Sequence, residues 1–164
     1  MADLDCSVEI AHVQSSLSRA WRFLSGERRV FEYRPAVGDA PRFADFSFFM
    51  PLTIATRTRQ GGVGVLMQRG DATQVASYMF GAARDQVDDA DLHDACAEVC
   101  NVLSDCVAMH FGAEHAVKLG LPQCASATET ENIVENNVAT AVYQGCTGAH
   151  RLWIVLYDSL SLPS

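Results

Sequence analysis

The chain has 164 residues, of which 49 % are hydrophobic and 20 % are charged, and its formal net charge is −8. This length fits one domain, residues 1–164, with a hydrophobic core of its own. The negative charge disfavours nonspecific binding to nucleic acid, which depends on Lys and Arg neutralising phosphates. No run of sequence reaches the roughly 18 apolar residues that a membrane helix needs.

The first residues are acidic and lack the basic region of a signal peptide. We therefore expect a cytoplasmic protein that has neither nucleic acid nor a membrane as its partner. The six cysteines are expected to be reduced thiols in that compartment.

The N-terminal third predicts one helix followed by a loop. Apolar residues recur at helical spacing over 7–24, and Gly26 stops the pattern. Residues 26–43 hold two prolines and two glycines, which indicates a loop that includes at most a short extended piece. The basic residues Arg19, Arg22, Arg28 and Arg29 are interpreted as a solvated surface.

A hairpin and a short helix are predicted next. Residues 47–60 alternate like a strand, with Pro51 indicating a bend or an edge position at its start. Gly61–Gly62 is a hairpin signal, so residues 63–70 are expected to return as a second strand. Asp71 is expected to cap a helix over 72–81 that Gly81 closes.

The second half predicts a long helix and then strands. Residues 91–111 read as one helix, which the acids of 85–91 help to initiate and Gly112 ends. Strand-like segments follow at 116–125, 136–144 and 151–158, the last apolar enough to be a central strand. The predicted fold class is α+β, a mixed, largely antiparallel sheet packed against helices, with the long helix carrying the site.

The long helix has a polar face on which an acid and an amide lie one turn apart. Asp94, Glu98 and Asn101 fall within one sector of about 60° at 100° per residue. The small residues Ala97 and Ala108 beside them leave room for another molecule. Asparagine is a mediocre helix former in mid-helix, and its amide can both donate to and accept from a water. Asn101 is therefore suited to orient a water, whereas it is no strong base.

Other chemistry finds little support in the sequence. There is no P-loop, Rossmann glycine pattern or nucleophile elbow. His93, Cys96 and Cys100 share one flank of the helix, but no further motif completes a zinc site, and structural packing is the preferred interpretation. His110 and His115 lie near the helix end, where the helix dipole favours a partly charged imidazole.

These residues resemble the CheX-like members of the CheC/CheX/FliY phosphatases of bacterial chemotaxis. That family has an Asp/Ser-x3-Glu-x2-Asn helix signature, which Asp94, Glu98 and Asn101 match, and a later proline before a strand, to which Leu121-Pro122 is similar. The segment 53–81 is similar to the strand, Gly-rich turn, strand and helix that precede the signature. The spacing from Asn101 to Pro122 is slightly shorter than the family's usual pattern.

The resemblance implies a reaction and a partner. Such proteins hydrolyse the phospho-aspartate of a CheY-type response-regulator receiver domain, so Asn101 is expected to orient the attacking water and Glu98 to anchor the receiver through a lysine. Asp94, Ala97 and Asp105 are expected to contact the partner as well. The resemblance implies no metal or cofactor of this chain's own, and a Mg²⁺ ion in the receiver.

Several alternatives stay open. A noncatalytic module that binds a receiver or another signalling protein is the main one, and a thiol or metal sensor built on His93, Cys96 and Cys100 is a minor one. The 7–24 helix carries no Glu-x2-Asn, so one site per chain is expected. Because CheX-type proteins pair through sheet edges, a homodimer is open to this chain, and the sequence leaves the oligomeric state and the cognate regulator undecided.

Overall fold

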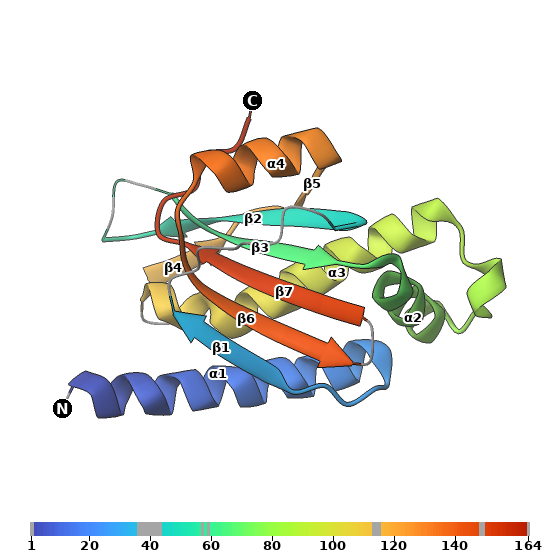
Figure 1. Cartoon of the computed structure of the whole chain (residues 1–164), viewed down its shortest axis with the longest axis horizontal. Coiled ribbons are helices and arrows are strands. Elements are labelled where there is room, and N and C mark those ends of the chain that lie inside the picture. Colours follow the sequence, from blue (N-terminus) through green and yellow to red (C-terminus); the bar gives the residue numbers. More distant parts are fainter. Residues whose placement is uncertain are drawn as a thin grey trace.

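The computed structural model describes residues 2–35, 44–56, 58, 60–112, 116–147 and 150–163. These residues form an α+β fold in which helices pack on a seven-stranded sheet (Figure 1). The elements in chain order are α1 (Ala2–Ser25), β1 (Phe31–Pro35), β2 (Phe46–Ile54), β3 (Gly61–Met67), α2 (Arg69–Phe80), η1 (Arg84–Gln86), α3 (Asp89–Val107), η2 (Ala108–Phe111), β4 (Val117–Leu119), β5 (Gln123–Ala125), α4 (Ala127–Asn136), β6 (Ala139–Thr147) and β7 (His150–Tyr157).

The strands follow the order β1-β6-β7-β3-β2-β4, with β5 paired to β2 beside β4. Every pairing between described strands is antiparallel. This confirms the predicted α+β class with a largely antiparallel sheet, and the described strands show none of the parallel pairs that a mixed sheet would have. β7 lies between β6 and β3, which confirms the central position that its apolar sequence predicted.

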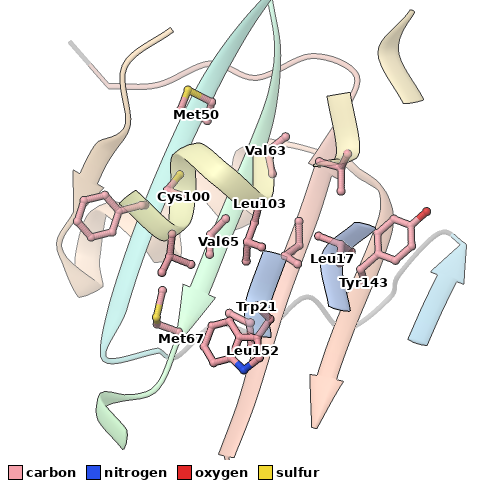
Figure 2. Packing of buried hydrophobic residues seen from close by; sticks show 14 of the residues in the cluster. Leu17, Trp21, Met50, Val63, Val65, Met67, Cys100, Leu103, Tyr143 and Leu152 are labelled. Carbon is pink, nitrogen blue, oxygen red and sulfur yellow. The ribbon is translucent and has the colours of Figure 1, made fainter. Parts of the chain in front are cut away.

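The larger core lies between the sheet and the helices α1, α2 and α3. Side chains from α1 and α3 meet side chains of the sheet in the close-up of Figure 2, where Trp21 and Leu103 are both fully buried. α2 packs against both α1 and α3. The helices on this face are therefore held together by one continuous apolar cluster, which fixes where α3 lies.

A smaller core covers part of the opposite face, where α4 and the C-terminal segment pack (Figure 1). Ile133 of α4 and Leu160 of the C-terminal segment contact the sheet side chains Phe49, Val155 and Tyr157. The sequence pattern did not predict α4, and a strand was expected to start at residue 136 instead. It also joined β4 and β5 into one strand, whereas Pro122 lies between them.

Gly61 and Gly62 lie inside β3 and not in the turn that they were expected to form. β2 ends at Ile54, and β3 begins at Gly61. A Cβ atom at position 62 would overlap the side chain of Leu160, so this glycine leaves space for the C-terminal segment against the sheet. Pro51 likewise lies within β2 and not at its start; it faces β3 on one side and the gap between β4 and β5 on the other.

The start of α2 differs from the expectation. Gln68 is the N-cap and Asp71 lies in the first turn, where it is buried. Its carboxylate receives two hydrogen bonds from Arg29, at 3.0 Å from Nη1 and 2.7 Å from Nη2. The interpretation of Arg29 as solvated surface was therefore wrong, while Gly81 closes α2 with a positive φ of 63° as predicted.

None of the helices in the described part of the chain is both long enough and apolar enough to cross a membrane.

Candidate functional site

The helix α3 begins at a reciprocal cap. The Asp88 carboxylate accepts a hydrogen bond from the backbone N–H of Asp91, and the Asp91 carboxylate accepts one from the backbone N–H of Asp88. This arrangement satisfies two backbone donors at the helix start and places negative charge where the helix dipole favours it. The acids before the helix thus initiate it, as the sequence predicted, and the α-helix runs from Asp89 to Val107 before η2.

One face of α3 is fixed in the core. Its buried residues recur at helical spacing and are Leu92, Ala95, Cys96, Val99, Cys100, Leu103, Ser104 and Val107. Cys100 and Leu103, on either side of Asn101, point into the cluster drawn in Figure 2. The backbone at position 101 therefore belongs to a helix that is immobilised by packing.

The opposite face carries the residues that the sequence singled out. Asp94, Glu98 and Asp105 are exposed, and Asn101 is half-buried between them. Within the described residues, the side chains of Glu98 and Asn101 form no hydrogen bond or ion pair. A carboxylate and a carboxamide are thus presented one turn apart, free to bind groups of another molecule.

Asp94 and Ala97 border this pair. An oxygen of Asp94 lies 3.8 Å from Nδ1 of His93, and both side chains are more than half exposed. The His93 ring packs its edge against Phe48 of β2, with centroids 5.1 Å apart. Ala97 is half-buried, and its small side chain does not protrude from the surface beside Glu98.

A cavity of about 600 Å³ opens one turn beyond Asn101, at Asp105. Its other lining residues come from α1, the end of α3 and the edge of the sheet, and they are His12, Ala108, Met109, Gly112, Val117 and Leu119. No pattern in the sequence indicates this hollow, because its walls come from elements far apart in the chain. It lies next to the polar face, with which it shares Asp105.

The helix cysteines serve packing. Cys96 and Cys100 are fully buried in the core, and burial raises the pKa of each thiol to about 12. Burial also raises the pKa of the half-buried Cys106 to about 11. Thiols with such pKa values are protonated and therefore poor nucleophiles at neutral pH. Among the residues that the structure describes, no three His, Cys, Asp or Glu side chains are grouped to hold a metal ion.

His110, in η2, has the opposite electrostatic character from the one expected. Burial lowers its pKa, and the carboxylate of Glu9 only partly offsets that effect. Its Nε2 atom forms a hydrogen bond with the Tyr143 hydroxyl, and its ring stacks on Tyr33. The lowered pKa runs against the expectation of a partly charged imidazole, because burial disfavours the charged form of the ring. His115 lies outside the described residues.

The lowered pKa of His110 predicts a pH dependence of stability. Between the folded pKa and the unfolded value near 6.5, the unfolded chain binds more protons, so the free energy of unfolding falls as the pH drops through this interval. His110→Gln retains a hydrogen-bonding group for Tyr143. The free energy of unfolding of this variant should fall less than that of the wild type between about pH 7 and about pH 5.5. Urea titrations at several pH values measure this, with His12→Gln on exposed α1 surface as the control. Parallel curves for wild type and H110Q would contradict the assignment.

The later proline takes the place that the sequence suggested. Pro122 immediately precedes β5, and both β4 and β5 pair with β2. β4 also lies beside α3 and η2. The segment around Leu121-Pro122 therefore belongs to the sheet edge near the end of the site helix, and Leu121 is 80 % exposed there.

Comparisons by structure identify the fold. The chain is similar to CheX from Vibrio vulnificus, with 12 % identity, a TM-score of 0.65 and coverage of 91 % of this chain and 97 % of that one. It is also similar to CheX of Borrelia burgdorferi, solved in a complex with CheY, BeF3 and Mg²⁺, with 15 % identity, a TM-score of 0.63 and coverage of 90 % of this chain and 96 % of that one. A chemotactic CheC-like protein from Shewanella oneidensis MR-1 is similar as well, with 11 % identity, a TM-score of 0.64 and coverage of 90 % of this chain and 95 % of that one.

No protein-family model and no curated protein sequence matches the chain. The structural likeness spans nearly the whole of this chain and of the three neighbours. It establishes a CheC/CheX-like fold and confirms the fold that the helix signature implied.

Proposed function

We propose that this chain, which has the CheC/CheX-like fold, is a phosphatase that hydrolyses the phospho-aspartate of a CheY-type receiver domain. One observation carries the proposal: Glu98 and Asn101 lie unpaired, within the described residues, on the open face of a helix whose other face is fixed in the core. The neighbour whose complex contains CheY supports this choice of partner.

In the proposed reaction, Asn101 enters the receiver's active site and holds a water in line with phosphorus. The oxygen of this water forms a new bond to phosphorus while the bond between phosphorus and the aspartyl oxygen breaks. Inorganic phosphate and a free aspartate carboxylate result, and the proton of the water passes to solvent. An amide suits this task, because phosphoryl transfer depends on positioning and on charge stabilisation more than on proton abstraction.

Glu98 is proposed to anchor the complex by pairing with a lysine of the receiver. Its carboxylate is exposed and has no intramolecular partner among the described residues, so the ion pair need not compete with an existing one. Asp94, Ala97 and Asp105 border the contact, and the cavity beside Asp105 extends it toward the end of α3. The Mg²⁺ ion belongs to the receiver in this proposal, and the action is cytoplasmic; the homodimer stays a prediction.

Glu98→Gln should weaken the complex with the receiver about tenfold, since an intermolecular charge pair becomes a neutral contact. Titration of a labelled, phosphorylated receiver measures the dissociation constant. Glu131→Gln is the matched control, because Glu131 is equally exposed but lies on α4, over the other face of the sheet. Equal affinities for the two variants would remove Glu98 from the interface.

The proposed function is tested by measuring phosphate release from a panel of phosphorylated CheY-type receivers with and without the protein. Acceleration for at least one receiver supports the phosphatase. Saturable binding of a receiver without faster phosphate release would instead favour the noncatalytic signalling module, and neither binding nor acceleration across the panel would reject both. The panel is needed because the cognate regulator is not encoded in this chain.

A further inference from the structure

A second cavity, of about 490 Å³, lies between α1 and the segment that leads into β1. Its lining is strongly basic and includes Arg19 and Arg22 of α1, Arg28 and Arg29 of the following segment, and the hydroxyl residues Ser15 and Ser18. None of its described lining side chains is acidic. Four of the twelve basic residues of a chain with net charge −8 are thus gathered at one hollow.

Three of these arginines form no ion pair with any residue in the described part of the chain. Arg29 is buried and neutralised by Asp71. Arg19, Arg22 and Arg28 are exposed and form no ion pair with another described residue. Like charges three residues apart on a helix repel each other weakly, so an anion between Arg19 and Arg22 would relieve this repulsion.

The buried ion pair gives this basic surface a rigid floor. Arg29 is held by two hydrogen bonds to Asp71 and by its stacking over the Trp21 ring, 4.4 Å from the centroid. It therefore fixes the segment that carries Arg28 against α1, which carries Arg19 and Arg22. The three unpaired guanidinium groups are brought to one hollow by this packing.

We propose that this cavity binds a small molecule with a diphosphate or triphosphate chain. Guanidinium groups match phosphate oxygens in bidentate geometry, and the volume falls within the usual range of small-molecule sites, about 300–1,000 Å³. A single phosphate carries about two negative charges at neutral pH and leaves one of the three arginines unmatched. A diphosphate or triphosphate supplies the remaining charge, and Ser15 and Ser18 offer hydroxyl donors beside it.

This site is separate from the polar face of α3, and the inference does not depend on the proposed phosphatase activity. Its lining residues are all in 15–30, whereas the proposed receiver contact is built on α3. Asn101→Ala should therefore bind the anion as the wild type does.

Calorimetric titration with phosphate, pyrophosphate and ATP in metal-free buffer tests the proposal. Pyrophosphate and ATP should bind saturably at one site, and phosphate about tenfold more weakly. Arg22→Gln and Arg28→Gln should each weaken pyrophosphate binding about tenfold, the effect expected for one charge-assisted contact. Arg151→Gln, the same substitution on the exposed start of β7, is the control and should leave binding unchanged.

Equal affinity for pyrophosphate and ATP would show that a diphosphate is sufficient, and tighter binding of ATP would show that its third phosphate or its nucleoside adds contacts. Absence of saturable binding at millimolar pyrophosphate and ATP would overturn the proposal. It would also be overturned if R151Q lost as much affinity as R22Q, since binding would then reflect net charge alone. The substituted side chains are exposed, and unchanged thermal unfolding of each variant without ligand verifies its fold.

Discussion

Asn101→Ala is expected to slow phosphate release from a phosphorylated receiver about 100-fold or more while leaving the affinity for the receiver within a factor of about two. The alanine keeps the helix and removes the amide that would hold the water. An effect on rate without an effect on binding is the signature of a group that acts mainly in the transition state. Single-turnover decay of the phosphorylated receiver, measured at saturating protein, reports the rate alone.

Asn101→Gln sharpens this test, because it retains the amide and moves it by one methylene. Displacing a positioning group by about 1 Å can cost about 100-fold, so the glutamine variant should be nearly as slow as the alanine variant. Restoration of the rate by glutamine would indicate that only the polarity of the surface matters.

The control for position 101 is Asn132→Ala on α4. Asn132 is exposed, and α4 packs on the face of the sheet opposite to α3. This variant should dephosphorylate the receiver at the wild-type rate. Equal rates for N101A and the wild type would exclude Asn101 as the water-positioning group, and acceleration would then have to come from another part of the surface.

Asp71→Asn is expected to lower the free energy of unfolding by about 3–5 kcal/mol, because it leaves the buried guanidinium of Arg29 without its counter-charge. Both side chains of this pair are nearly inaccessible to solvent, at 1 % for Arg29 and 4 % for Asp71. The same carboxylate lies in the first turn of α2, where the helix dipole adds to its stabilisation. Urea denaturation followed by circular dichroism measures the loss.

An exposed ion pair in the same protein provides the contrast. Asp89 lies 3.5 Å from Arg69, and both side chains are largely exposed, so Asp89→Asn should change stability by less than about 1 kcal/mol. The double variant Arg29→Met/Asp71→Leu should recover much of the loss seen in D71N, since no buried charge is left unpaired. A loss of unfolding free energy in D71N that is as small as the loss in D89N would contradict the role assigned to the buried pair of Arg29 and Asp71.

The long helix could be predicted because its signals are local. Acids cap its start, apolar side chains repeat at helical spacing, and Gly112 follows its end. The same periodicity separates the buried face from the face of Glu98 and Asn101, so the position of this pair opposite the core also follows from the sequence. The chemical role of Glu98 and Asn101 was inferred from the resemblance of the helix to the CheC/CheX/FliY signature, and it stays a prediction.

The missed elements had weak or misread local signals. α4 has only ten residues and buries only Thr130 and Ile133, too few for a clear apolar stripe. A capping box between Ser126 and Glu129 was nevertheless present at its start. Gly61-Gly62 was misread because a glycine that makes room for a distant segment looks like a glycine that forms a turn.

Long-range partners could not be derived from one sequence. Arg29 and Asp71 are 42 positions apart, and neither lies in a pattern that distinguishes a buried charge from a solvated one. The cavity at Asp105 depends in the same way on α1, η2 and the strand β4 meeting at the end of α3. Local sequence preferences can assign each of these residues to a helix or a strand. Only the packing of the helices and strands brings the residues into contact.

The two-sided build of α3 has an evolutionary consequence. Positions 94, 98 and 105 contribute little to the folded core, so mutation there is tolerated as far as stability is concerned. If the proposed function holds, duplicated genes can therefore diverge in which regulator they recognise without passing through unfolded intermediates. Parallel pathways in one cell can become insulated from crosstalk by exchanging a handful of solvent-facing side chains on an unchanged scaffold.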